Sequence, residues 1–116
     1  MCIRDRYGLD CFIVNSPTQR DIDAARAGLE EVTAAIADNH FDMVILDEVC
    51  IALYYKLFSV DEVISLLRKK TAEMEIILTG RYAPEELIAT ADLVTEMREI
   101  KHYYSRGVEA SKGIEY

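Results

Sequence analysis

The chain has 116 residues, enough for one domain with a hydrophobic core but small for two. Hydrophobic residues make up 51% of it and charged residues 29%, a balance typical of a soluble globular domain. The net charge of −8 argues against broad binding to nucleic acid or to an anionic membrane, because both need a basic surface. No stretch of the sequence approaches the roughly 20 apolar residues of a membrane-spanning helix, and no secretory signal is visible.

The three cysteines, Cys2, Cys11 and Cys50, lie far apart and lack C-x-x-C spacing. This pattern supports neither a disulfide framework nor a zinc site, so a reduced cytoplasmic location is expected. Residues 1–6 show no periodicity and lead into no clear helix cap. We expect them to be a non-native leader and exclude them from the fold argument.

A long helix is predicted after residues 11–14, which form either a short strand or an ordered loop. Ser16 can cap this helix, Pro17 suits its first position and Gln19 completes a capping box. Apolar residues then recur at spacings of three and four, which puts them on one core-facing side: Ile22, Ala25, Leu29, Val32 and Ile36. The helix is expected to end near residues 38–39.

An uninterrupted apolar run, Met43–Leu46, is followed at once by Asp47 and Glu48. The run predicts a strand buried on both faces, as in the middle of a parallel α/β sheet. In such sheets ligands bind outside the carboxyl ends of the strands, which is where the two acids fall. They could hold Mg²⁺ on a nucleotide phosphate or activate a water. The alternative is a strand that ends in a solvated acidic turn.

Two helices and a second strand are predicted next. Residues 49–55 are apolar and long enough for about two helical turns, and Ser59–Glu62 form a capping box that starts a further helix. Residues 75–78 then predict a buried strand, which leads into Gly80 and Arg81. Gly80 permits close backbone approach to a ligand, and Arg81 could bind a phosphate bidentately.

The remaining elements complete an alternating pattern. Pro84 and the acids after it predict a short helix that ends near Asp92, and Leu93–Met97 predicts a third strand. Alternating helices and strands imply right-handed crossovers and a parallel sheet. The basic, tyrosine-containing tail could fold over an anionic ligand or simply follow the surface. No G-x-x-x-x-G-K-[ST] phosphate loop is present.

Four ordered motifs together resemble the P-loop type of ATP:corrinoid adenosyltransferase. They are Asp42–Glu48, Leu78–Arg81, Ala91–His102 and Lys112–Tyr116. The resemblance implies transfer of the 5′-deoxyadenosyl group of ATP to the cobalt of a reduced corrinoid, with release of triphosphate. It further implies a homodimer and a flavoprotein reductant. The negative net charge already gives no reason to expect a nucleic-acid or membrane partner.

The fold implied is α/β, a P-loop (RecA-like) three-layer parallel sheet with flanking helices. The family's first strand and phosphate loop are missing from the sequence. We therefore expect residues 7–116 to be the C-terminal part of a single P-loop nucleotide-binding domain. Without the phosphate loop, we expect this polypeptide alone to be inactive and weakly stable.

The resemblance also assigns site residues, and it implies no catalytic nucleophile on the protein. Asp47 and Glu48 match the Walker B acids that help to hold Mg²⁺. The other assignments are nucleotide or corrinoid contacts: Thr79, Gly80, Arg81, Glu96, Arg98, Lys101, His102 and, at the lower face of the corrinoid, Phe12. Val14 stands about where the family often has a tryptophan, and the chain has none.

Two other functions fit parts of the sequence. Another RecA-like P-loop ATPase or nucleotide kinase would share the acidic strand but need not share the motifs in residues 93–102 and 112–116. A non-catalytic module could instead bind a partner through an exposed sheet edge. Consumption of ATP that depends on a reduced corrinoid would separate the adenosyltransferase from the ATPase or kinase.

Overall fold

The longest element of the protein is the helix α1, Gln19–Asp38, in a computed structural model that describes residues 17–102. Thr18 caps it: the Thr18 hydroxyl accepts from the Asp21 N–H, and the Asp21 carboxylate accepts from the Thr18 N–H at 2.8 Å. The expected box from Ser16 to Gln19 is therefore wrong. Threonine and aspartate form the same kind of capping box two residues later and satisfy the corresponding backbone N–H groups. Asn39, in the left-handed conformation, ends the helix as expected.

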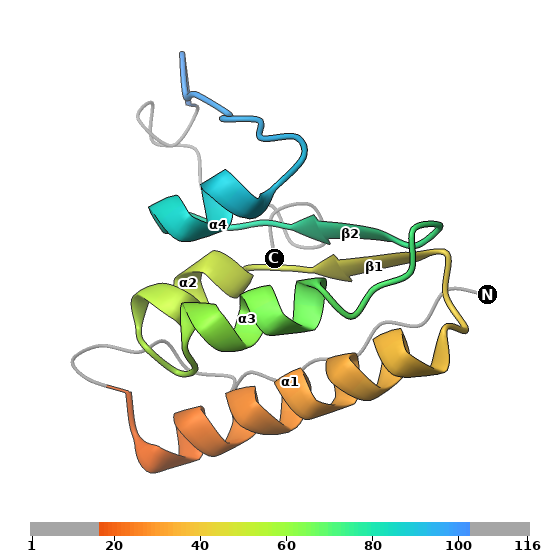
Figure 1. The fold of residues 1–116 in the computed structure, drawn as a ribbon. Coiled ribbons are helices and arrows are strands. Elements are labelled where there is room, and N and C mark those ends of the chain that lie inside the picture. The colour runs from red at the N-terminus through yellow and green to blue at the C-terminus, as the bar shows by residue number, and fades with distance from the viewer. Residues whose placement is uncertain (1–16, 103–116) are drawn as a thin grey trace.

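The other elements follow in the predicted order up to the fourth helix: β1 Met43–Leu46, α2 Val49–Tyr54, α3 Val60–Leu67, β2 Glu75–Leu78 and α4 Glu85–Thr90. The strands β1 and β2 pair in parallel, with Val44 opposite Ile76 and Leu46 opposite Leu78. The described part of the chain is thus an α/β arrangement with a small parallel sheet (Figure 1). None of its helices is long and apolar enough to cross a membrane.

The core lies on one side of this sheet. Ile36 of α1, Leu66 of α3 and Met74 are almost fully buried together, and Val44 and Ile76 pack against them from the sheet. A second cluster centres on α2 and α3 and includes Leu87 of α4. Leu46 and Leu78 of the sheet pack against this second cluster, so the helices of both clusters cover the same face of the strands.

The opposite face of the sheet is exposed. Met43 and Ile45 of β1 are 52% and 58% exposed, and Ile77 of β2 is 41% exposed. The prediction that β1 is buried on both faces is wrong for the described structure. An apolar run indicates a buried strand only when further elements cover its second face.

The third predicted strand, Leu93–Met97, is also wrong. This segment forms no strand, and Leu93 and Met97 are 84% and 94% exposed. A strand needs a neighbour to pair with its backbone, and the sheet formed within residues 17–102 contains only β1 and β2. In Figure 1 the segment lies beyond α4, on the side away from α1.

Candidate functional site

The parallel pairing brings the ends of β1 and β2 together, and Thr79 joins them. The Thr79 Oγ1 donates to Asp47 Oδ1 at 2.8 Å and accepts from the Glu48 N–H at 2.9 Å. The Thr79 N–H continues the ladder by donating to the Leu46 carbonyl at 3.2 Å. The hydroxyl thus fixes the Asp47 carboxylate at the carboxyl edge of the sheet.

The backbone turns sharply on both sides of this contact. Glu48 has a φ of 60° and Gly80 a φ of 134°. A side chain at position 80 would place its Cβ 2.8 Å from the Cys50 Cβ and 3.1 Å from the Cys50 nitrogen. Only glycine allows this combination of left-handed φ and close approach, so Gly80 lets the loop after β2 pack directly on α2.

Cys50 lies under this loop and is 4% exposed. Its N–H donates to the Thr79 carbonyl at 3.2 Å, which ties the first turn of α2 to the end of β2. Burial, and secondarily the charge of Glu48, raises the pKa of the Cys50 thiol. The thiol is therefore protonated at neutral pH, which fits a packing role and not a nucleophilic one.

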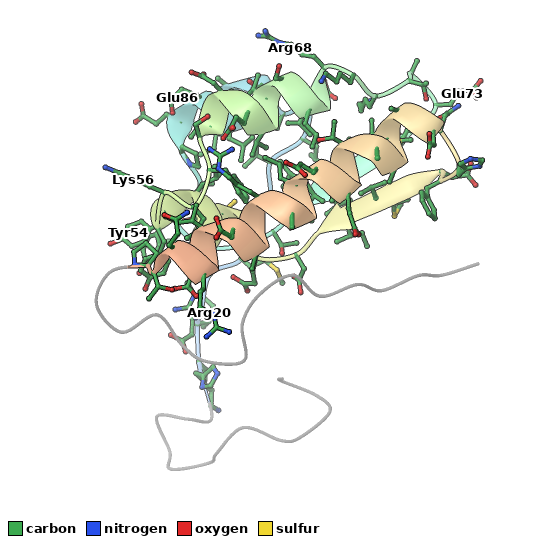
Figure 2. The ribbon with its side chains drawn as sticks, turned by 90° about the horizontal axis from the view of Figure 1, so that it is seen from below. Arg20, Tyr54, Lys56, Arg68, Glu73 and Glu86 are labelled. Atoms are coloured by element: carbon green, nitrogen blue, oxygen red, sulfur yellow. The ribbon has the colours of Figure 1, made fainter. Side chains whose placement is uncertain are left out.

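Arg81 is exposed and follows the glycine directly. Within residues 17–102 its guanidinium has no hydrogen-bond or ion-pair partner, so it is available to an anion. The next residue, Tyr82, has a φ of 60° and stacks on Tyr54, with ring centroids 4.6 Å apart. Figure 2 shows Tyr54 at the periphery of the molecule, close to Lys56.

The predicted residues of the segment after α4 are not brought to this site. Glu96, Arg98 and Lys101 are exposed and make no hydrogen bond or ion pair with Asp47, Glu48 or Thr79. His102 Nδ1 lies 4.0 Å from Glu99 Oε1 within the same segment. Phe12 lies outside the described residues.

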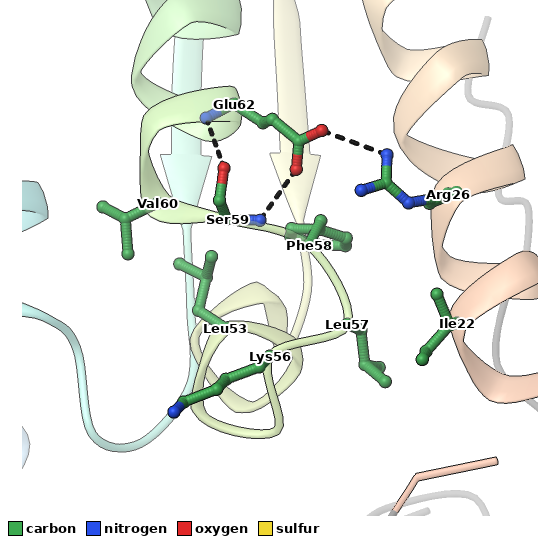
Figure 3. Close-up of a pocket in the computed structure, with 9 residues that line it drawn as sticks. All are labelled: Ile22, Arg26, Leu53, Lys56, Leu57, Phe58, Ser59, Val60 and Glu62. Atoms are coloured by element: carbon green, nitrogen blue, oxygen red, sulfur yellow. Dashed lines mark hydrogen bonds and ion pairs between the residues drawn. The ribbon is translucent and has the colours of Figure 1, made fainter. Parts of the chain in front are cut away.

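A separate open groove of about 680 Å³ lies between α1 and the connection from α2 to α3 (Figure 3). Leu53 and Phe58 line it, and Glu62 closes one side by accepting from Arg26 Nη1 at 3.0 Å and the Ser59 N–H at 2.7 Å. Chiefly the Ser59 N–H, and after it Arg26, lowers the pKa of the Glu62 carboxyl despite partial burial. None of the predicted site residues within residues 17–102 lines this groove.

The family of the chain is decided by comparison with known proteins. A family model described as "ATP:corrinoid adenosyltransferase BtuR/CobO/CobP" matches residues 2–116.

The chain belongs to this adenosyltransferase family.

Among similar proteins, a corrinoid adenosyltransferase of Sinorhizobium sp is 43% identical over 98 residues, which are 84% of this chain and 46% of that protein. The corrinoid adenosyltransferase of Pseudomonas aeruginosa is 37% identical over 98 residues, covering 84% of this chain and 48% of that protein. That of Escherichia coli is 33% identical over 98 residues, covering 84% and 50%. The chain thus spans about half the length of the curated relatives it matches.

The sequence placed Asp47, Glu48 and Thr79 at the ends of two strands, and the structure brings Asp47 and Thr79 into contact. It did not anticipate that Gly80 packs on Cys50 or that Tyr82 stacks on Tyr54. The glycine signalled a close approach but not its partner. Nothing in the sequence pattern pairs the two tyrosines, because they are far apart in the chain.

Proposed function

We propose that this chain supplies the acid-bearing half of a corrinoid adenosyltransferase, which transfers the 5′-deoxyadenosyl group of ATP to a reduced corrinoid. Family membership supports this proposal. The observation that carries it is the Asp47–Thr79–Glu48 contact, in which one hydroxyl fixes the Asp47 carboxylate and the backbone N–H of Glu48 at the carboxyl ends of parallel strands. This is where open α/β sheets bind their ligands.

The reaction needs no nucleophile from the protein. The Co(I) lone pair of the corrinoid attacks C5′ of ATP and forms a cobalt–carbon bond. The C5′–O5′ bond breaks, and triphosphate leaves with its electron pair. The protein therefore contributes positioning and charge stabilisation of the leaving triphosphate.

The donor set at the sheet edge fits Mg²⁺ that arrives with the triphosphate. Mg²⁺ usually takes one or two carboxylates from the protein and completes its shell with phosphates and waters. Within residues 17–102 no group of three or more His, Cys, Asp or Glu side chains is arranged to hold a metal ion. Asp47 and Glu48 would hold the ion, and the ion would offset charge on the phosphates. Arg81 would bind a phosphate oxygen beside them.

The finer features belong to the same proposal. The small sheet would be part of a three-layer, RecA-like P-loop domain, and residues 7–116 would be its C-terminal part. Four residues of the segment after α4 would contact ATP or the corrinoid: Glu96, Arg98, Lys101 and His102. Phe12 would lie at the lower face of the corrinoid. The enzyme would act as a cytoplasmic homodimer, and a flavoprotein would reduce the corrinoid that it binds.

The test is an assay with ATP and cob(I)alamin. The chain is assayed alone and after fusion to the half of the Sinorhizobium relative that it does not span. We expect adenosylated corrinoid and triphosphate in equal amounts from the fusion, and no turnover from the chain alone. Corrinoid-independent release of phosphate or diphosphate would instead establish the ATPase or kinase alternative, and failure to bind ATP at all would favour the binding module.

A matched pair of variants locates the activity at the sheet edge. Both variants are made in the active fusion. Asp47→Asn removes one carboxylate after β1, and we expect at least a tenfold loss of adenosyltransferase activity, about the effect of disturbing the surroundings of a bound metal. Asp42→Asn changes an exposed acid before β1 and should leave the rate within about twofold, because it lies at the amino end of the strand. Equal losses in both variants would contradict the assignment.

A further inference from the structure

The loop after β2 is held along one face of α2 at three successive points. Thr79 accepts from the Cys50 N–H, Gly80 packs against the Cys50 side chain, and Tyr82 stacks on Tyr54. Cys50 and Tyr54 are four residues apart in α2, so they lie on the same face of the helix. Arg81 sits between the second and third contacts, and its position in space depends on both.

The third contact is unusual because its backbone is strained. Tyr82 has a φ of 60°, a left-handed conformation that bulky residues rarely adopt. Such a conformation persists only when surrounding contacts hold it, and it concentrates where position matters for function. Tyr82 is 65% exposed, so core burial does not hold it in place.

The ring contact that Tyr82 makes is with Tyr54. The ring centroids are 4.6 Å apart with an interplanar angle of 33°, and Tyr54 is itself braced edge-on by Tyr55 at 5.4 Å. Stacked aromatic pairs stabilise a structure beyond the area that they bury. Tyr54 is 57% exposed, so neither ring of the pair belongs to the core.

We propose that Tyr54 and Tyr82 form an aromatic clasp that fixes residues 79–82 along α2 and thereby positions Arg81 for the triphosphate. The clasp itself follows from the contacts above, and the role of Arg81 rests on the proposed function. The two tyrosines are positioning residues: they act on the nucleotide through Arg81 and the backbone of the loop. Because the clasp orders the loop before ATP binds, less conformational entropy is lost on binding.

Amide hydrogen exchange tests the clasp on the chain without any need for activity. The reporters are the Cys50 N–H, bonded to the Thr79 carbonyl, and the Glu48 N–H, bonded to the Thr79 hydroxyl. We expect Tyr54→Ala and Tyr82→Asn to accelerate exchange at both amides roughly two- to tenfold, since a stacked pair contributes about that factor. Asparagine tolerates the left-handed φ, so Tyr82→Asn removes the ring without adding strain.

The controls separate the clasp from a general loss of stability. Tyr54→Phe and Tyr82→Phe keep both rings and should retain wild-type exchange. Ile88→Ala removes a side chain of similar exposure, 45%, from α4 and should leave both reporters unchanged. Unchanged exchange at Cys50 and Glu48 in the ring-deleted variants would overturn the clasp. So would equal acceleration at the Arg68 amide, which bonds the Ile64 carbonyl in α3.

The role of Arg81 is tested separately in the active fusion. We expect Tyr54→Ala to raise the KM for ATP roughly two- to tenfold and to leave the KM for the corrinoid unchanged, with Tyr54→Phe normal for both. Faster exchange with an unchanged KM for ATP would overturn the positioning of Arg81. A fusion that has no adenosyltransferase activity would instead overturn the proposed function, and the exchange experiment would still decide the clasp.

Discussion

At the scale of one residue, Thr79 links the ends of β1 and β2, because its hydroxyl both donates to the Asp47 carboxylate and accepts from the Glu48 N–H. Thr79→Val keeps the shape of the side chain and removes both hydrogen bonds. We expect the free energy of unfolding to fall by about 1–2 kcal/mol, since each bond contributes roughly 1 kcal/mol net. Urea denaturation measures this change.

The matched control is Thr90→Val in α4. The Thr90 hydroxyl donates only to the Glu86 carbonyl of its own helix, at 2.8 Å, and is exposed. Its loss should change the free energy of unfolding by no more than about 0.5 kcal/mol. A Thr79→Val variant as stable as Thr90→Val would mean that the bridge between the strands is absent in solution.

The buried thiol of Cys50 makes stability depend on pH in the alkaline range. Its pKa is raised in the folded state, first by burial and then by Glu48, so folding favours the protonated thiol. This contribution is fully present below the unfolded pKa, about 8.5, and is lost as pH rises through the folded pKa. We expect the free energy of unfolding to fall above about pH 8.5 in a Cys2→Ser/Cys11→Ser background.

Two variants check this alkaline dependence. Cys50→Ala should remove the part of the pH dependence that starts at that point. Glu48→Gln should bring the onset of thiolate formation to a lower pH, because it removes the second cause of the raised pKa. Iodoacetamide labelling of the folded chain, followed against pH, reports the thiolate directly. Labelling of Cys50 as fast as that of an exposed thiol at pH 7 would contradict the buried position.

The helix α3 shows at the scale of one element how local chemistry fixes an end. The Ser59 hydroxyl accepts from the Glu62 N–H at 3.2 Å, and the Glu62 carboxylate accepts from the Ser59 N–H at 2.7 Å. We expect Ser59→Ala to lower the free energy of unfolding by about 1 kcal/mol. Ser65→Ala, at an exposed position within the same helix, should be neutral or slightly stabilising in thermal unfolding. Equal effects would show that the cap contributes nothing.

Such elements were predictable because their signals are local. The Ser59–Glu62 box and the β1 and β2 runs each lie within a few residues, and all three occur at the predicted positions, although the strands are exposed on one face. The cap of α1 was misplaced because Thr18 and Asp21 offer the same chemistry as the expected Ser16 and Gln19. Leu93–Met97 failed as a strand because pairing depends on a distant neighbour, which an apolar run does not specify.

The candidate site likewise divides into residues with a local sequence signal and residues whose contacts depend on the tertiary structure. Asp47, Thr79 and Gly80 were recognisable because each stands next to a strand end, and parallel strands carry their carboxyl ends to one edge. The ligand-binding roles assigned to these three residues stay predictions, as do those of Glu96, Arg98 and Lys101, which rest on the family resemblance. The packing of Tyr54 on Tyr82 depends on how the loop after β2 meets α2, which is a tertiary property.

At the scale of the whole molecule, the core formed within residues 17–102 lies on one face of the sheet. Ile76 packs inward with Ile36 and Met74, whereas its neighbour Ile77 points to the other face and is 41% exposed. These two residues therefore form a matched pair: the same side chain, adjacent in one strand, on opposite faces.

We expect Ile76→Ala to lower the free energy of unfolding by about 1–2 kcal/mol. This is at or below the lower end of the cost of truncating a fully buried isoleucine, because Ile76 is only half-buried. Ile77→Ala should cost less than about 0.5 kcal/mol, the usual range for surface substitutions. Urea denaturation of the chain at several protein concentrations measures both. If Ile77→Ala cost as much as Ile76→Ala, the outward face would be buried in solution. A cost that grew with protein concentration would assign that burial to association between copies, because binding that is specific to the folded state adds stability by mass action.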